Sequence, residues 1–201
     1  LPLTLPLLRK VIASIFYGDM LVALRSQTYP YEDRRGDADA MTEKWISTIQ
    51  GWIRGDKNYS AHDMKKRFYD IAADYATIPI TRVPKVKVGV VGEIYVKYSP
   101  LGNNDLEKFL ESQDCEVNLP GLMGFVEYCV ANYRLDIDLY GGNKLVAGGA
   151  DKFLGWLDGI GCASYDAMRK YGFYAPGSFR ELMKKPEGII SLGAKMGEGW
   201  L

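Results

Sequence analysis

The chain has 201 residues, of which 47% are apolar and 25% are charged, as is typical of a globular protein that buries a core. Basic and acidic residues each number 25, so the formal net charge is zero, and no basic stripe indicates a nucleic-acid surface. No apolar run reaches the roughly 18 residues that a membrane span requires. We therefore expect no nucleic-acid partner and no membrane partner.

The three cysteines are sparse and far apart. Cys115, Cys129 and Cys162 show no Cys-x-x-Cys spacing, which is typical of reduced thiols in a cytoplasmic protein. The chain has no initiator Met, and it stops at Gly199-Trp200-Leu201, directly after an apolar segment. We expect a segment of a longer protein.

Residues 1–84 are predicted to form mainly helices. Apolar side chains recur with helical spacing from Leu7 to Leu24 and from Met41 to Trp52. Ser60 and Asp63 resemble a capping box, which indicates the start of a third helix. We expect these residues to form a helical layer or subdomain at the start of the chain.

A strand–loop–helix–strand unit follows a connector that contains two prolines. The pattern predicts a strand from Lys87 to Ile94, a helix from Asp105 to Ser112 and a second strand from about Cys115 to Leu119. Such a unit is the basic piece of a parallel sheet. We therefore expect residues 85–201 to form an α/β domain, and the whole chain to be helix-rich α/β with a small parallel sheet.

The rest of the chain is predicted to be mainly helical. The apolar segment from Leu122 to Val130 predicts a helix, and helical spacing returns from Lys152 to Tyr171. Between these two segments, Tyr133 to Asp151 has no clear pattern, because two Gly-Gly pairs interrupt it. Ser178 and Glu181 match a second capping box and predict a short helix after them.

Several kinds of active site lack their residues in this sequence. The only histidine, His62, is predicted in the first turn of a helix, so a Ser-His-Asp or Cys-His arrangement is not supported. Cysteine and histidine are too few for a zinc site. A run from Asp136 to Gly141 imitates the opening of a calcium loop without its later ligands, and no phosphate-binding P-loop is present. We expect no metal site in this chain.

The loop after the first predicted strand is the candidate site, because ligands of open parallel sheets bind at the carboxyl ends of strands. A helix N-terminus in this loop suits a phosphate or carboxylate. We predict Glu93 as the catalytic residue, which orients the ligand or accepts a proton. The predicted ligand-binding residues in the loop are Tyr95, Ser99, Gly102, Asn103 and Asn104. The alternative interpretation is a structural loop in which Asn104 caps the following helix.

Residues 92–104, with the sequence GEIYVKYSPLGNN, resemble a signature of proteins related to the 2-hydroxyacyl-CoA dehydratases and their ATP-dependent activators. More narrowly, this segment looks like the large activase-associated proteins of that superfamily. Two further segments fit the same family, Arg25 to Gly36 and Gly197 to Leu201, and they occur in the expected order. The resemblance thus extends over most of the chain, and residues 92–104 are its most specific part.

The resemblance implies an anaerobic, cytoplasmic system in which an ATPase activator passes an electron to an iron–sulfur dehydratase component. Such components have flavodoxin-like (Rossmann-like) α/β domains, so we expect this chain to be flavodoxin-like in part. The cysteines expected as cluster ligands are not recognisable here, and the actin-like ATPase part is absent. We therefore expect no cofactor in this segment, an iron–sulfur cluster in the parent protein, and no catalysis by the segment alone.

The resemblance also implies a function, in which the segment contributes a substrate- or partner-binding site to CoA-linked dehydration. The expected ligand is an acyl-CoA or another anionic small molecule, and Glu198 is predicted to contribute from the end of the chain. The alternative is a non-catalytic scaffold or docking domain for the activator ATPase or another subunit, which the 14 Tyr and 4 Trp would suit. A concave pocket at the Glu93 loop would favour the first function, and a flat apolar surface there would favour the second.

Overall fold

The computed structural model describes residues 4–185 and 189. Long helices dominate the described chain, and they are α1 (Leu5–Thr28), α2 (Asp37–Arg54), α3 (Ala61–Tyr75), α7 (Leu122–Tyr140) and α8 (Lys144–Lys170). The shorter elements are η1 (Tyr29–Tyr31), β1 (Lys87–Gly89), α4 (Ile94–Tyr98), α5 (Pro100–Asn103), α6 (Leu106–Ser112), β2 (Glu116–Asn118) and α9 (Phe179–Lys184). Within residues 4–185 and 189, no helix combines the length and the hydropathy needed to cross a membrane.

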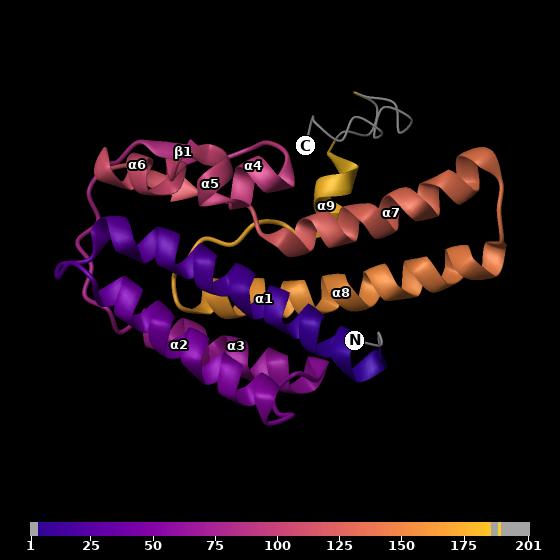
Figure 1. Ribbon diagram of the computed structural model, residues 1–201, viewed down its shortest axis with the longest axis horizontal. Helices are drawn as coiled ribbons and strands as arrows, with labels where there is room; N and C mark the ends of the chain where they lie inside the picture. Colours follow the sequence, from indigo (N-terminus) through magenta and orange to yellow (C-terminus); the bar gives the residue numbers. More distant parts are fainter. Residues whose placement is uncertain (1–3, 186–188, 190–201) are drawn as a thin grey trace.

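Helix α1 crosses the molecule and packs against α2, α3, α7 and α8, and α3 also packs directly against α8 (Figure 1). Phe16, Tyr17 and Met20 are buried on α1, and they belong to one cluster of core side chains that α2, α3, α7 and α8 complete. Residues before and after position 84, where the sequence predicts a domain boundary, therefore share one core. That boundary stays a prediction about folding units.

The predicted α/β character is confirmed, because β1 and β2 form a two-stranded parallel sheet in which Val88 pairs with Val117. The crossover between the strands carries α6, the one helix that the pattern predicts there, and it also carries α4 and α5, where the pattern predicts the end of a strand and a loop. The strand expected to reach Ile94 is shorter, and this part of the prediction is wrong. Gly92 adopts a φ of +140°, which L side chains rarely adopt, and the chain turns there into α4.

The α7–α8 hairpin is longer than the sequence predicts. Helix α7 continues to Tyr140 and ends where Gly141 adopts a φ of +83°, whereas α8 runs without a break through Gly148 and Gly149. Each interior glycine costs a helix about 1 kcal/mol relative to alanine, and contacts between the two helices offset this cost. Arg134 on α7 donates a hydrogen bond from Nε to Oδ2 of Asp151 on α8, at 2.9 Å.

The N-terminus of α7 is fixed by a carboxylate of α1. Asp19 accepts hydrogen bonds from the backbone N–H groups of Leu122 at 2.8 Å and of Met123 at 2.7 Å. These are two of the N–H groups that a helix start leaves without a partner inside the helix, so Asp19 acts as a cap from another element. Gly121 allows this approach, because a Cβ at that position would lie 2.6 Å from Asp19 Oδ2. The start of α7 is thereby held beside the sheet.

Candidate functional site

The predicted site residues on the Glu93 loop are occupied largely with local hydrogen bonds. The Glu93 carboxylate caps α4 by accepting a hydrogen bond from the backbone N–H of Tyr95, at 3.0 Å. Ser99 caps α5 by accepting from Gly102 N–H at 3.3 Å. Glu93 is exposed and opens a helix, so it does not close an apolar strand as the sequence predicts.

The two asparagines of the loop have different roles. The Asn103 side chain donates to the carbonyl of Val96 at 2.9 Å and accepts from Leu106 N–H at 3.2 Å, which ties α6 to α4. Asn104 ends α5 in the left-handed conformation, with a φ of 55°. The cap expected from Asn104 at the following helix is therefore supplied by Asn103.

Gly102 and Tyr95 are packed against each other. A Cβ at position 102 would lie 2.9 Å from the Tyr95 ring, so glycine is required there for packing. Tyr95 itself is 57% exposed. The loop residues do not line the large cavity described next, and their assignment as a ligand site stays a prediction. Glu198 lies outside the described residues.

A cavity of about 560 Å³ lies between the sheet, α1, the first half of α7, the second half of α8 and the segment from Tyr174 to Leu182. Its lining includes the whole of β1 and β2 and the residues that follow β2, so the cavity runs along the sheet and past the carboxyl end of β2. That is the position at which open parallel sheets bind ligands, and the volume is in the range of small-molecule sites.

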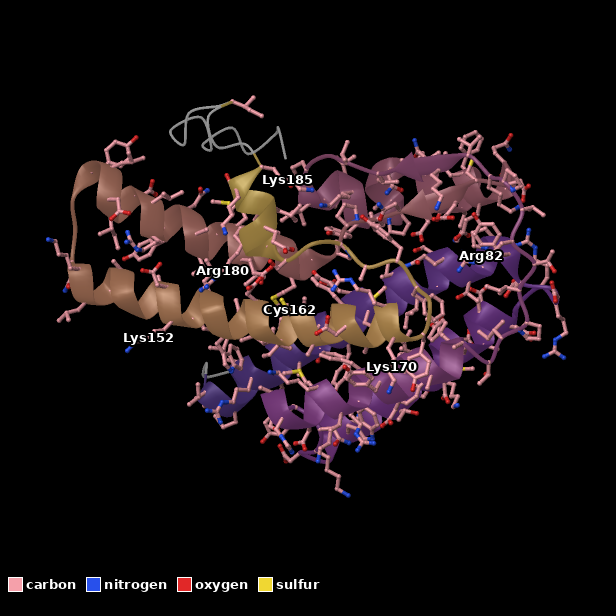
Figure 2. The ribbon with its side chains drawn as sticks, turned by 180° about the vertical axis from the view of Figure 1, so that it is seen from behind. Arg82, Lys152, Cys162, Lys170, Arg180 and Lys185 are labelled. Atoms are coloured by element: carbon pink, nitrogen blue, oxygen red, sulfur yellow. The ribbon has the colours of Figure 1, made fainter. Side chains whose placement is uncertain are left out.

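One wall of the cavity is a strap between α8 and α9. Gln27 on α1 donates from Nε2 to the carbonyl of Tyr174 at 3.0 Å, and its Oε1 accepts from Tyr174 N–H at 2.7 Å. The strap continues into α9, from which Arg180 extends towards α8 (Figure 2). Arg180 lies against Gly155, where a Cβ would be 2.8 Å from Nη2. Helix α9 opens with the predicted capping box of Ser178 and Glu181, which is confirmed.

Glu127 is the unusual residue of the cavity. Its side chain projects from α7 into the cavity lining, and the residue is only 6% exposed. It makes no hydrogen bond and no ion pair within the part of the chain that the structure describes. Burial, followed by the negative charges of Asp158 and Asp19, raises the pKa of Glu127 to about 7. The carboxyl group is therefore able both to give and to accept a proton near neutral pH.

Three further polar side chains share the cavity with Glu127. Asp158 lies on α8, and its nearest cation is Arg180, at 3.9 Å between Oδ2 and Nε. Ser164 is 5% exposed and lines the cavity, and its hydroxyl has no hydrogen-bond partner among the described residues. Burial raises the pKa of Tyr165, and the charge of Glu127 raises it further. This wall of the cavity is consequently electronegative.

The other walls of the cavity are apolar. Phe16 and Met20 come from α1, Met123 comes from α7 and Met168 from α8, and all four are buried. Apolar walls lower the local dielectric constant, so the interaction of a ligand with Glu127 is stronger there than at the surface. The cavity thus combines an apolar body with a small set of converging polar groups.

Sequence reasoning missed this site, although one signal for it was present. Glu127 is the only charged residue between Leu122 and Val130, in a helix that is otherwise apolar, and an isolated carboxylate in such a run needs a partner or a function. Asp158 occupies a similar position between Leu157 and Ile160. Glu127 and Asp158 are far apart in the sequence, so the sequence alone does not show that both acids line one cavity.

The described residues do not form a metal centre. Residues 4–185 and 189 contain no group of three or more His, Cys, Asp and Glu side chains arranged to hold a metal ion. A cluster ligated entirely by cysteine requires four thiolates, and the chain has three cysteines, on or beside three different elements. This chain alone therefore does not fit such a cluster.

A scan against protein-family models gave no match, and searches of curated proteins and of solved structures gave none either.

Proposed function

We propose that this chain is a ligand-binding α/β module, flavodoxin-like in part, of a cytoplasmic protein related to the 2-hydroxyacyl-CoA dehydratases and their activators. The observation that carries the proposal is the buried, unpaired Glu127 carboxyl at a cavity that runs along the parallel strand pair and past the carboxyl end of β2. The resemblance of residues 92–104 supplies the reaction class. The three cysteines, which are few and far apart in the sequence, support a reducing compartment.

In this proposal the cavity takes the acyl end of the ligand, and the phosphates of CoA stay outside. The electronegative wall with Glu127 and Asp158 would repel phosphate groups, whereas a 2-hydroxyl group can donate a hydrogen bond to a carboxylate. The apolar walls suit an acyl chain. The iron–sulfur cluster and the activator ATPase belong to the rest of the parent protein or to its partners.

The test is a calorimetric titration with 2-hydroxybutyryl-CoA and with butyryl-CoA, which lacks only the hydroxyl group. We expect the hydroxylated thioester to bind more tightly, and the Glu127→Gln variant to bind it about tenfold more weakly, because hydrogen bonds to a charged group contribute about 1.5–3 kcal/mol. Glu93→Gln is the matched change on the exposed loop, and the cavity proposal expects wild-type affinity for it.

The outcomes separate the two candidate sites. A loss of affinity in Glu93→Gln with none in Glu127→Gln would place the ligand on the loop, as the sequence predicts. Absence of binding by either thioester would contradict the acyl-CoA function.

A docking function is the second candidate, and one specific observation favours it. The crossover exposes large apolar side chains, including Val91, Tyr95, Leu101 at 85% and Phe109. A surface of this kind suits a protein partner, such as the activator ATPase or another subunit. This function predicts that the thioester titrations give no binding, so the same experiment distinguishes it from the first proposal.

A further inference from the structure

Two polar side chains in the cavity are more than nine-tenths buried and have no partner. Glu127 is 6% exposed and Ser164 is 5% exposed, they come from α7 and α8, and both line the cavity. Neither makes a hydrogen bond with the described residues. Neither has an oxygen among the fully buried atoms that lack a partner, so the oxygens of both side chains are open to the cavity, where water or a ligand can reach them. A bound ligand that supplies hydrogen-bond donors would satisfy Glu127, and Ser164 could contact the same group.

The charges around the cavity favour a cation. Asp158 from α8 and Asp19 from α1 are the negative groups whose charges act on Glu127. Arg180, the nearest cation to Asp158, has a side chain that is more than half exposed and lies 3.9 Å away. Lys87 at the strand side is largely exposed and is already paired with Glu116, at 3.0 Å. The inner wall therefore carries more negative than positive charge, which disfavours a carboxylate or a phosphate there.

The remaining walls indicate an organic cation and not a metal ion. Among the described residues, no group of His, Cys, Asp and Glu is arranged to hold a metal. The cavity is instead lined by apolar side chains such as Met20, Met123 and Met168, and by the aromatic rings of Phe16 and Tyr165. Methionine walls accommodate an alkyl stem, and aromatic faces attract an ammonium group.

We infer that the cavity binds a protonated primary amine on an apolar stem, with its nitrogen against the Glu127 carboxylate and within reach of Asp158 and Ser164. This inference rests on the proposed function only in taking the cavity as a ligand site, and it does not depend on acyl-CoA. The ammonium group supplies three donors, which matches the acceptors that Glu127, Asp158 and Ser164 offer.

The experiment uses three probes of equal chain length: n-hexylamine, 1-hexanol and hexanoate. Each is titrated at pH 7 into the full chain and followed by ligand-observed NMR. The amine is expected to bind at least tenfold more tightly than the alcohol, and hexanoate is expected not to bind. Glu127→Gln should reduce the affinity for the amine about tenfold more than it reduces the affinity for the alcohol, because both probes donate a hydrogen bond to the carboxylate and only the amine also carries a charge that the carboxylate attracts.

Two further variants keep the test decisive. Asp158→Asn should weaken amine binding in the same direction, so the inference can be tested even if Glu127→Gln does not fold. Glu43→Gln, at an exposed position on α2, is the control and should bind the amine like the wild type. Hexanoate binding as tightly as the amine, or an amine affinity unchanged in both cavity variants, would overturn the inference.

The inference and the proposed function fail in different ways. Amine binding that depends on Glu127, without any binding of 2-hydroxybutyryl-CoA, supports the inference and contradicts the acyl-CoA function. Thioester binding that depends on Glu127, without amine binding, overturns the inference and leaves the acyl-CoA function in place.

Discussion

Replacing Arg25 by Met is expected to lower the free energy of unfolding by about 3 kcal/mol, because it leaves a buried carboxylate without its partner. The Arg25 side chain is 21% exposed, and the Glu111 side chain that it contacts is 8% exposed. Urea denaturation at pH 7, followed by far-UV circular dichroism, measures the change. The loss should be among the largest for a single substitution outside the apolar core.

The geometry around Arg25 explains the size of this effect. Its guanidinium donates from Nε to Asp39 on α2 at 2.6 Å and from Nη1 to Glu111 on α6 at 2.5 Å. Glu107, also on α6, lies 3.7 Å from Nη1. Burial raises the pKa of Glu107, and the charge of Glu111 raises it further, whereas Arg25 lowers it. Removing Arg25 would therefore leave two neighbouring carboxylates on α6 to repel each other.

The controls for Arg25 test whether stability depends on the simultaneous contact of its guanidinium group with Asp39 and Glu111. Arg25→Lys keeps one charge but not the two-sided contact, so an intermediate loss is expected. Arg34→Met removes an exposed pair with Asp37 within one turn, and no measurable loss is expected. A loss for Arg25→Met as small as that for Arg34→Met would show that Arg25 does not hold the crossover against α1 and α2.

The second large effect is a stabilisation. Glu127→Gln is expected to raise the free energy of unfolding at pH 8 by about 2 kcal/mol, because it removes a carboxylate that burial destabilises. The pKa of Glu127 rises from its ordinary value of 4.5 to about 7 in the folded chain. The full shift corresponds to a larger energy, and the smaller figure allows for screening by water that enters the cavity.

The direction of the pH dependence follows from the raised pKa. The neutral carboxyl is compatible with burial, so its contribution is fully present below about pH 4.5 and is lost as the pH rises through 7. The wild type and Glu127→Gln should therefore have similar stability at pH 4.5 and differ most at pH 8. Urea titrations at pH 4.5, 6 and 8 give the difference between the two chains at each pH.

Glu43→Gln is the matched control for this comparison, because Glu43 is exposed on α2. Its difference from the wild type should be small at all three pH values. A constant gap between Glu127→Gln and the wild type from pH 4.5 to pH 8 would contradict the assignment of a raised pKa. A variant that is less stable than the wild type at pH 8 would contradict it as well.

Local signals in the sequence predicted much of the fold. The parallel strand pair around α4–α6 follows from apolar runs separated by a crossover, and the cap of Ser60 at α3 follows from residue types at fixed spacing. These features depend on neighbours in the sequence. The apolar residues on either side of Gly92 predict that it belongs to a strand. The chain turns there because Gly92 adopts a positive φ, which the pattern of apolar residues does not predict.

The cavity depends on contacts that are distant in sequence, and this is why it was not predicted. Glu127 and Asp158 lie on the two different helices of the α7–α8 hairpin, and Asp19 reaches the cavity from α1. The sequence predicts the ligand site at the Glu93 loop only because ligands of parallel sheets generally bind at the carboxyl ends of strands. The cavity does extend past the carboxyl end of β2, but the rest of its lining comes from α1, α7, α8 and the segment from Tyr174 to Leu182 and not from the Glu93 loop.

The most direct test of the Glu127 site is a carboxyl NMR titration of the full chain labelled with ¹³C-glutamate. The Glu127 signal is assigned by its absence in Glu127→Gln, and its shift is followed against pH with and without n-hexylamine. We predict a pKa near 7 in the free chain that falls when the amine is bound, because the ammonium group favours the carboxylate. An ordinary glutamate pKa that the amine does not change would contradict the site.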